Sequence, residues 1–145
     1  MMDLPDWQFG FALIPRTALR PTQSPYWATT YVTVPANSYR LFTIGKGFSI
    51  DKEWIEVGER FSIWYVIFSI DQNSLIEAGV GVEEKENPGT VTLLALRYGY
   101  GKAEFPAGIF FDFEANTRPV YYIANYSSVD VTCDFIVFGV IEKIV

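Results

Sequence analysis

The chain of 145 residues contains no histidine and only one cysteine, Cys133. Histidine is the most versatile general base near neutral pH and the commonest metal ligand. Its absence excludes Ser-His-Asp and Cys-His nucleophile systems, cupin-like metal sites and zinc sites of the Cys/His type. A single cysteine cannot form an intrachain disulfide, and we expect Cys133 to behave as a small buried apolar residue. The sequence therefore predicts a protein that is not an enzyme and holds no cofactor.

Charged residues are also scarce, at 19% of the chain against a typical value of about 25%. The net charge is −6, and the 11 lysines and arginines are scattered singly. Nucleic-acid binders need a basic patch to neutralise phosphates, so neither nucleic acid nor an anionic membrane is expected as a partner. The low charge indicates that less than the usual share of the surface faces water.

Long apolar runs are missing as well. No run approaches the roughly 20 residues of a membrane-spanning helix. The first ten residues, MMDLPDWQFG, lack the positive and apolar regions of a signal peptide. We therefore expect a protein that is made in the cytoplasm without a signal peptide and that does not enter a membrane.

What the sequence does contain is a series of short segments with a period of two, separated by turn residues. No segment shows a sustained helical period of 3.6 residues. The expected strands are 27–34, 39–44, 47–50, 54–57, 61–70, 75–82, 90–98, 109–114, 120–126 and 129–141. This pattern predicts an all-β fold, an antiparallel β-sandwich of the jelly-roll kind, as a single domain over residues 27–145.

Residues 1–26 differ from the rest of the chain. Prolines interrupt them repeatedly and disfavour regular structure. The segment also carries Trp7, Phe9 and Phe11, and such large apolar residues are rare in disordered tails. We predict an extended N-terminal arm that docks on its own domain or on a neighbouring subunit.

Two expected strands are apolar on both faces. In 61–70, FSIWYVIFSI, simple alternation puts Phe61, Ile63, Tyr65 and Ile67 on one face and Trp64, Val66, Phe68 and Ile70 on the other. The last strand loses its polar face at Ile136, Phe138 and Val140. Because a two-layer sandwich buries one face of each sheet, the second face needs another cover. The arm, a second subunit or an apolar ligand would serve, and we favour the arm together with a neighbouring subunit. The predicted interface residues are Trp7, Phe9, Phe11, Trp64, Phe68, Ile136 and Phe138.

A second set of aromatic residues is a candidate for ligand binding. The segment 97–108, RYGYGKAEFPAG, is predicted to be a long flexible loop with exposed tyrosines, and loops on a β scaffold often bind ligands. A further group of tyrosines lies in VYYIANYSS, where packing is the alternative role. The candidate glycan-contact residues are Tyr98, Tyr100, Tyr121, Tyr122 and Tyr126.

Several polar motifs have simpler interpretations. Asp112 and Glu114 share one face of a strand, as a glycosidase pair would, but alternation alone produces such pairs. The groups Asp71-Gln72-Asn73 and Glu83-Glu84-Glu86 are turn and hairpin-tip sequences rather than complete calcium loops. Asn125-Tyr126-Ser127 matches the N-glycosylation pattern, and we interpret it as a chance match.

The arm DLPDWQFGFALIPRTALRPTQSPYW, the histidine-free all-β body and the apolar last strand ending in EKIV resemble small structural proteins of virus and bacteriophage particles. These are jelly-roll or β-sandwich proteins of the decoration (cement), vertex or minor coat type. The resemblance implies a non-enzymatic protein of the virion that forms a homo-oligomer, a trimer or larger, and binds a major capsid or other shell protein. The alternative is a carbohydrate-binding module that recognises a glycan.

Overall fold

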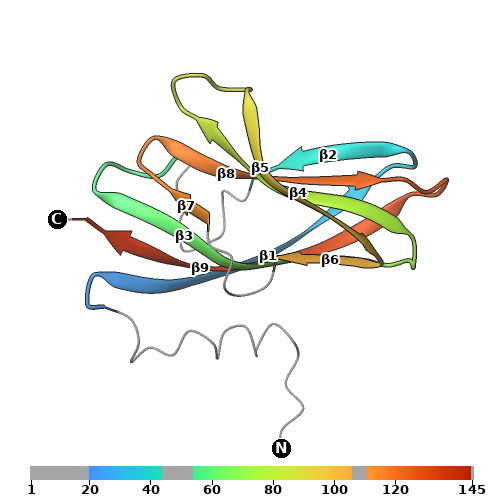
Figure 1. Cartoon of the computed structure of the whole chain (residues 1–145), viewed down its shortest axis with the longest axis horizontal. Coiled ribbons are helices and arrows are strands. Elements are labelled where there is room, and N and C mark those ends of the chain that lie inside the picture. The colour runs from blue at the N-terminus through green and yellow to red at the C-terminus, as the bar shows by residue number, and fades with distance from the viewer. Residues whose placement is uncertain (1–19, 44–53, 106–110, 145) are drawn as a thin grey trace, which may run out of the picture.

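The computed structural model describes residues 20–43, 54–105 and 111–144. Within these ranges every regular element is a strand (Figure 1). The strands are β1 (Gln23–Val34), β2 (Ser38–Phe42), β3 (Glu59–Ile70), β4 (Leu75–Glu84), β5 (Val91–Tyr100), β6 (Lys102–Phe105), β7 (Phe111–Phe113), β8 (Thr117–Asn125) and β9 (Val131–Lys143). The predicted all-β class is confirmed. The described residues include no helix of the length and apolarity needed to span a membrane.

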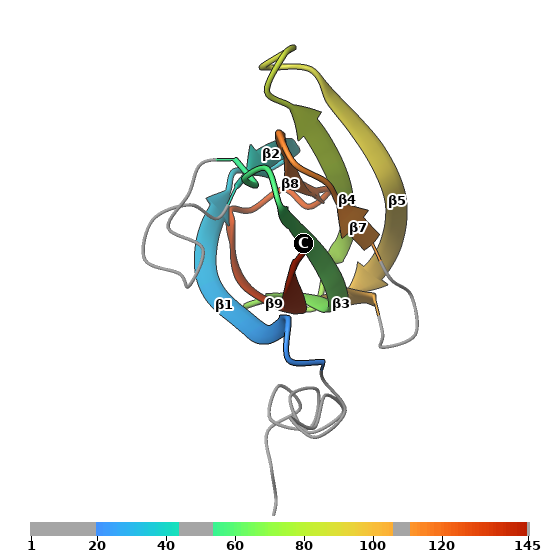
Figure 2. The ribbon, with the colours of Figure 1, turned by 90° about the vertical axis from the view of Figure 1, so that its left-hand side faces the viewer.

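The strands form two antiparallel sheets with the order of a jelly roll. Sheet A has the order β1-β9-β3-β6, with β7 also paired to β3, and sheet B has the order β2-β8-β4-β5. The pairs β4–β5, β3–β6, β2–β8 and β1–β9 are nested in sequence, as if one long hairpin had been rolled up. Figure 2 shows the two sheets curving around a shared interior. The predicted sandwich is therefore confirmed, and its strand order is that of a jelly roll.

Aromatic rings fill the space between the sheets. Phe135 of β9 lies 4.4 Å from Tyr121 of β8 and 5.1 Å from Phe42 of β2, measured between ring centroids. Phe68 of β3 joins the same group, 5.0 Å from Phe135. These rings join sheet A to sheet B directly, and edge or tilted contacts of this kind add to the stabilisation from burial. Cys133 is buried in the same core, as predicted.

Two of the predicted site residues are wrong for this reason. Phe68, predicted at a subunit interface, and Tyr121, predicted to contact a glycan, are buried between the sheets. Neither side chain faces a partner, because each points to the inner side of its strand.

A β-bulge in β3 explains why the faces of this strand were assigned incorrectly. The register with β9 shifts between Ile63 and Tyr65, so Trp64 is an extra residue in β3. Phe61 and Ile63 point into the core before the bulge, whereas Val66 and Phe68 do so after it. Simple alternation fails at this point, and the outward residues that follow the bulge include Tyr65.

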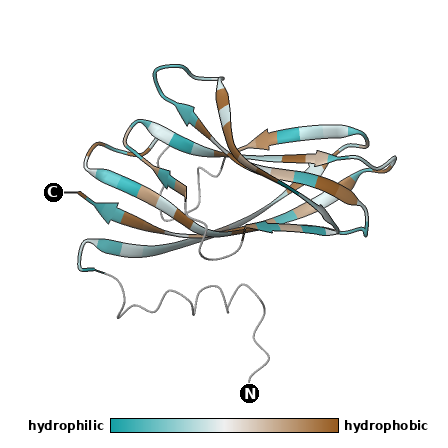
Figure 3. Ribbon diagram, in the orientation of Figure 1, coloured by the Kyte–Doolittle hydropathy of each residue, from teal (hydrophilic) through white to brown (hydrophobic). Residues whose placement is uncertain are grey.

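The second apolar face of the long strands is covered within the single chain. Phe138 and Val140 of β9 lie on the outer side of sheet A, yet they are only 1% and 2% exposed. Trp64, Tyr65 and Ile136 pack against them, and the ring of Trp27 stacks on Phe138 at 6.4 Å. We call these six residues the outer cluster. Figure 3 shows apolar residues along these strands and hydrophilic ones at the C-terminal end of β9.

Two other expectations about the chain differ from the structure, and others lie outside the residues that it describes. β1 begins at Gln23, so residues 23–26 belong to sheet A rather than to the arm. Residues 54–57 are not a strand, although Ile55 exchanges backbone hydrogen bonds with residues 116 and 117. The arm residues Trp7, Phe9 and Phe11 and the expected strand 47–50 lie outside the described residues.

The described part of the segment 97–108, residues 97–105, is not the loop that the sequence indicated. β5 continues to Tyr100, and β6 starts at Lys102 in the other sheet. Gly101 makes the corner with φ of +73°, a conformation that favours glycine. Gly99 stands close to the returning chain, since a Cβ there would lie 1.9 Å from the carbonyl oxygen of Lys102.

Gly139 of β9 lies where the core has no room for a side chain. A Cβ at this position would lie 2.3 Å from the carbonyl oxygen of Ser62 and 2.7 Å from the ring of Phe61. We expect Gly139→Ala to lower the free energy of unfolding by about 1–3 kcal/mol, because the strand and the ring must both shift. Urea denaturation measures this. Thr29→Ala, an exposed substitution in β1, is the control and should cost less than about 0.5 kcal/mol. Equal losses in the two variants would contradict this account.

Candidate functional site

The outer face of sheet B carries side chains from all four of its strands. The register places Tyr39, Ala124, Glu77 and Tyr98 in one row across β2, β8, β4 and β5. The neighbouring row contains Leu41, Tyr122, Gly79 and Leu96. Small residues therefore occupy much of the centre, and large aromatic and aliphatic side chains stand on both sides of it.

The carboxylate of Glu77 is the centre of this face. The hydroxyl of Tyr122 donates to Oε1 of Glu77 at 2.9 Å, and the hydroxyl of Tyr126 donates to the same atom at 3.2 Å. The hydroxyl of Tyr98 also interacts with the carboxylate and lowers its pKa. Glu77 is 8% exposed, and such a buried carboxylate needs these donors to offset its loss of hydration. We call Glu77, Tyr98, Tyr122 and Tyr126 the tyrosine–carboxylate site.

The hydrogen bonds determine the ionisation state of the site. The interaction with the hydroxyl of Tyr98, with smaller contributions from the bonds of Tyr122 and Tyr126, lowers the pKa of Glu77, although burial acts in the opposite direction. The carboxylate is therefore ionised at neutral pH. Burial, and then the contact with Glu77, raises the pKa of Tyr122, while the bond to Glu77 raises the pKa of Tyr98. The tyrosines stay protonated and serve as the donors.

Two of these tyrosines are largely exposed. Tyr98 is 65% exposed and Tyr126 is 51% exposed, and the hydroxyl of Tyr126 is bonded to the buried carboxylate. Much of the accessible area of these two side chains is therefore aromatic ring. The exposed ring of Tyr39 extends the surface, with its centroid 5.9 Å from that of Tyr122.

Asn125 fixes the backbone that carries Tyr126. Its Nδ2 donates to the carbonyl oxygens of Val34, Pro35 and Val129, and its Oδ1 accepts from the amide and hydroxyl of Ser127. The side chain is 1% exposed and has no room for a glycan. The match to the N-glycosylation pattern is therefore a structural turn, and Asn125 positions one edge of the site.

The structure brings together three of the five predicted contact tyrosines: Tyr98, Tyr122 and Tyr126. Tyr100 is exposed on the same strand as Tyr98, opposite Leu75 and one row further along. Glu77 was missed by the sequence analysis. Its one signal is a lone carboxylate in the otherwise apolar start of β4, LIEAGVGV, and nothing local shows that three tyrosines from other segments converge on it.

Several of the other acidic candidates have structural partners. Asp112 accepts a hydrogen bond from the hydroxyl of Ser62 at 2.5 Å, and the backbone carbonyl oxygen of Glu114 accepts a hydrogen bond from the amide of Thr117. Glu83 pairs with Arg118 at 2.6 Å and accepts the amide of Gly89. Oδ1 of Asp71 accepts the amide of Thr132. Across residues 20–43, 54–105 and 111–144, no group of three or more acidic, histidine or cysteine side chains gathers in a way that could hold a metal ion.

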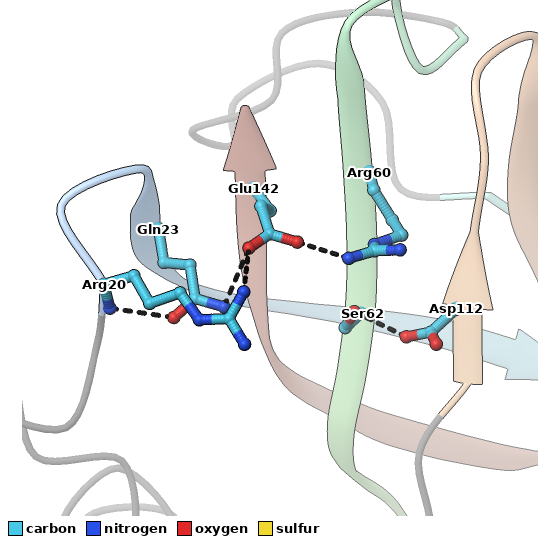
Figure 4. A network of polar contacts seen from close by, with 6 residues as sticks. All are labelled: Arg20, Gln23, Arg60, Ser62, Asp112 and Glu142. Carbon is cyan, nitrogen blue, oxygen red and sulfur yellow. Dashed lines mark hydrogen bonds and ion pairs between the residues drawn. The ribbon is translucent and has the colours of Figure 1, made fainter. Parts of the chain in front are cut away.

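A polar network lies on the outer side of sheet A, where β1 begins and β9 ends. Glu142 of β9 pairs with Arg60 of β3 and accepts a hydrogen bond from Gln23 of β1 at 3.2 Å (Figure 4). Arg20 approaches the same carboxylate at 3.5 Å. This network joins three strands at the end of sheet A next to the outer cluster, and we interpret it as structural.

Comparisons with known proteins give similarity of fold only. No protein-family model matches the chain, and no curated protein matches it. A solved structure of Bacillus endospore appendages, described as disulfide-linked pili, is similar over 86% of this chain and 90% of its own, with 9% identity and a TM-score of 0.46. The Yersinia pseudotuberculosis-derived mitogen is similar over 84% of this chain and 88% of its own, with 11% identity and a TM-score of 0.46. For a structure of infectious bursal disease virus the shares are 79% and 40%, with 11% identity and a TM-score of 0.18. The resemblance to viral and other structural β proteins is weak, and no function is transferred from these proteins.

The lowered pKa of Glu77 predicts an acid-dependent loss of stability. Its ordinary pKa is 4.5, and a group whose pKa is lower in the folded state contributes stability above that pH and loses it as the pH falls through the folded value. We expect the wild type to be more stable than Glu77→Gln at pH 7 and to lose this advantage on acidification below about pH 4.5. Urea denaturation of both proteins over a pH series measures the difference. An advantage that does not change with pH would contradict the hydrogen-bonding account.

Proposed function

We propose that the protein is a non-enzymatic structural protein that self-associates and decorates or stabilises a protein shell such as a viral capsid. The observation that carries the proposal is β5, a ten-residue strand at the edge of sheet B. Within the described part of the chain, only β4 pairs with it in the sheet. Long, apolar edge strands are templates for pairing with another chain, and monomeric proteins usually shield them.

β5 lacks the features that normally prevent such pairing. Its sequence, VTLLALRYGY, contains no proline and one charged residue, Arg97. Leu93, Leu94 and Leu96 are each exposed by 42–46%. The β1 edge of sheet A is better protected, because β1 contains Pro25, which has no amide hydrogen to donate.

A second copy of the chain is the occupant that fits this edge. Pairing two β5 strands brings no carboxylate against another, since Arg97 is the single charged residue in the strand. The half-exposed leucines of β5, Leu93, Leu94 and Leu96, add apolar side chains that a copy paired along this strand would contact.

Leu94→Lys tests the proposed contact. Leu94 is the extra residue at the register shift between β4 and β5, and it is half exposed. A lysine on an edge strand opposes pairing because its charge would be buried. We expect the wild type to be a dimer, trimer or larger oligomer at about 50 μM, and Leu94→Lys to be a monomer at that concentration. Size-exclusion chromatography with light scattering measures both masses. A closed dimer would indicate β5 pairing with β5, and a larger ring would indicate β5 pairing with another edge strand.

Val57→Lys is the matched control. Val57 is also an exposed aliphatic residue, but it lies in the turn before β3, away from the β5 edge. This variant should keep the mass of the wild type. A wild type that is monomeric at about 50 μM, or a Leu94→Lys variant with the mass of the wild type, would overturn the proposal.

Trp64→Ala separates the predicted interface on sheet A from the edge of sheet B. Trp64 packs in the outer cluster against Phe138, which the single chain already covers. We now expect this variant to lose about 1–3 kcal/mol of protomer stability and to keep the mass of the wild-type oligomer. Urea denaturation and light scattering give the two readouts. If the Trp64→Ala oligomer dissociated while the protomer kept its stability, the interface would lie on sheet A.

A further inference from the structure

The geometry points to the tyrosine–carboxylate site as a binding site for a neutral carbohydrate, on the outer face of sheet B. This site does not depend on the proposed self-association. It consists of a buried carboxylate, Glu77, surrounded by the hydroxyls of Tyr98, Tyr122 and Tyr126, which come from β5, from β8 and from the turn that follows β8.

The first argument is the way in which the rings are held. The hydroxyls of Tyr122 and Tyr126 are bonded to the carboxylate, so each of these rings has one end fixed on the sheet, while Tyr98 and Tyr126 remain half to two-thirds exposed. Fixed aromatic rings lose little further conformational entropy when a ligand stacks on them. The C–H groups on a pyranose ring carry a small positive charge and suit the negative face of an aromatic ring.

The second argument is the hydrogen-bonding character of the site. A tyrosine has one hydroxyl proton, and those of Tyr122 and Tyr126 are used on Glu77. These two phenolic oxygens keep lone pairs, so they can accept hydrogen bonds but cannot donate any. A carboxylate has about four acceptor positions, and two hydroxyls leave roughly two of them unused. The site thus offers acceptors, and its ligand must supply donors, as sugar hydroxyls do.

The third argument is charge. Glu77 is ionised, and the net charge of the chain is −6. Among the described residues, no lysine or arginine forms an ion pair with Glu77, so an acidic sugar would gain no ion pair from them and would be repelled by the carboxylate. The chemistry therefore favours neutral glycans over sialylated or sulfated ones.

The experiment uses the full-length protein on an array of neutral glycans and their sialylated counterparts, followed by calorimetric titration of the neutral glycan that gives the strongest signal. We expect the wild type to bind neutral glycans in preference to the sialylated ones. Tyr98→Ala should weaken binding at least tenfold, because it removes a stacking ring, whereas Tyr98→Phe, which keeps the ring, should weaken it less than Tyr98→Ala.

Tyr31→Ala is the matched control, since Tyr31 is an equally exposed tyrosine on β1 of sheet A. It should bind as the wild type does. Titration of the Leu94→Lys variant measures the affinity of a single site for the glycan. If this affinity equals that of the wild type, glycan binding does not depend on self-association. Three outcomes would overturn the inference: no binding to any glycan, equal affinities for Tyr98→Ala and Tyr31→Ala, or a preference for the sialylated glycans.

Discussion

The contact between the two sheets at Phe135, Tyr121 and Phe42 is the constraint on which the other features depend. Neighbouring residues of a strand point to opposite faces, so burying Tyr121 turns Tyr122 outward. The register of β8 with β4 then places Tyr122 opposite Gly79 and next to Glu77. The outer face of sheet B is thus determined by the same alternation that fills the core.

On sheet A the same principle is modified by one inserted residue. The bulge at Trp64 lets β3 bury Phe61 before it and Phe68 after it, although the two lie seven positions apart and regular alternation would put them on opposite faces. The side chains that turn outward at the bulge cover Phe138 and Val140. A strand with two apolar faces therefore does not by itself require a second subunit. The apolar surface that stays exposed lies mainly on sheet B.

The fold was predictable because it follows from local patterns, whereas the site depends on long-range register. Alternation and turn residues gave most of the strands and the jelly-roll sandwich. They did not give the bulge, so Phe68 was assigned to the wrong face, and they did not separate the inward Tyr121 from the outward Tyr122. Glu77 lies 45 residues from Tyr122 in sequence, and only the pairing of β4 with β8 brings them together. The pattern also predicts a loop at Gly99 and Gly101, because closely spaced glycines usually indicate a loop, whereas here they allow a sharp corner between β5 and β6.

The exposed β5 edge and the tyrosine–carboxylate site do not exclude each other, because one lies in the plane of sheet B and the other lies on its outer face. Strand pairing at β5 uses backbone groups in the plane of sheet B, whereas the rings of Tyr98 and Tyr126 lie on its outer face. Joining copies edge to edge would therefore leave these rings accessible and place several sites on one continuous surface. Binding of a repeated glycan by such an assembly would gain from effective concentration, so that modest affinity at each site gives firm attachment. A structural protein that self-associates would in this way also become an adhesive one.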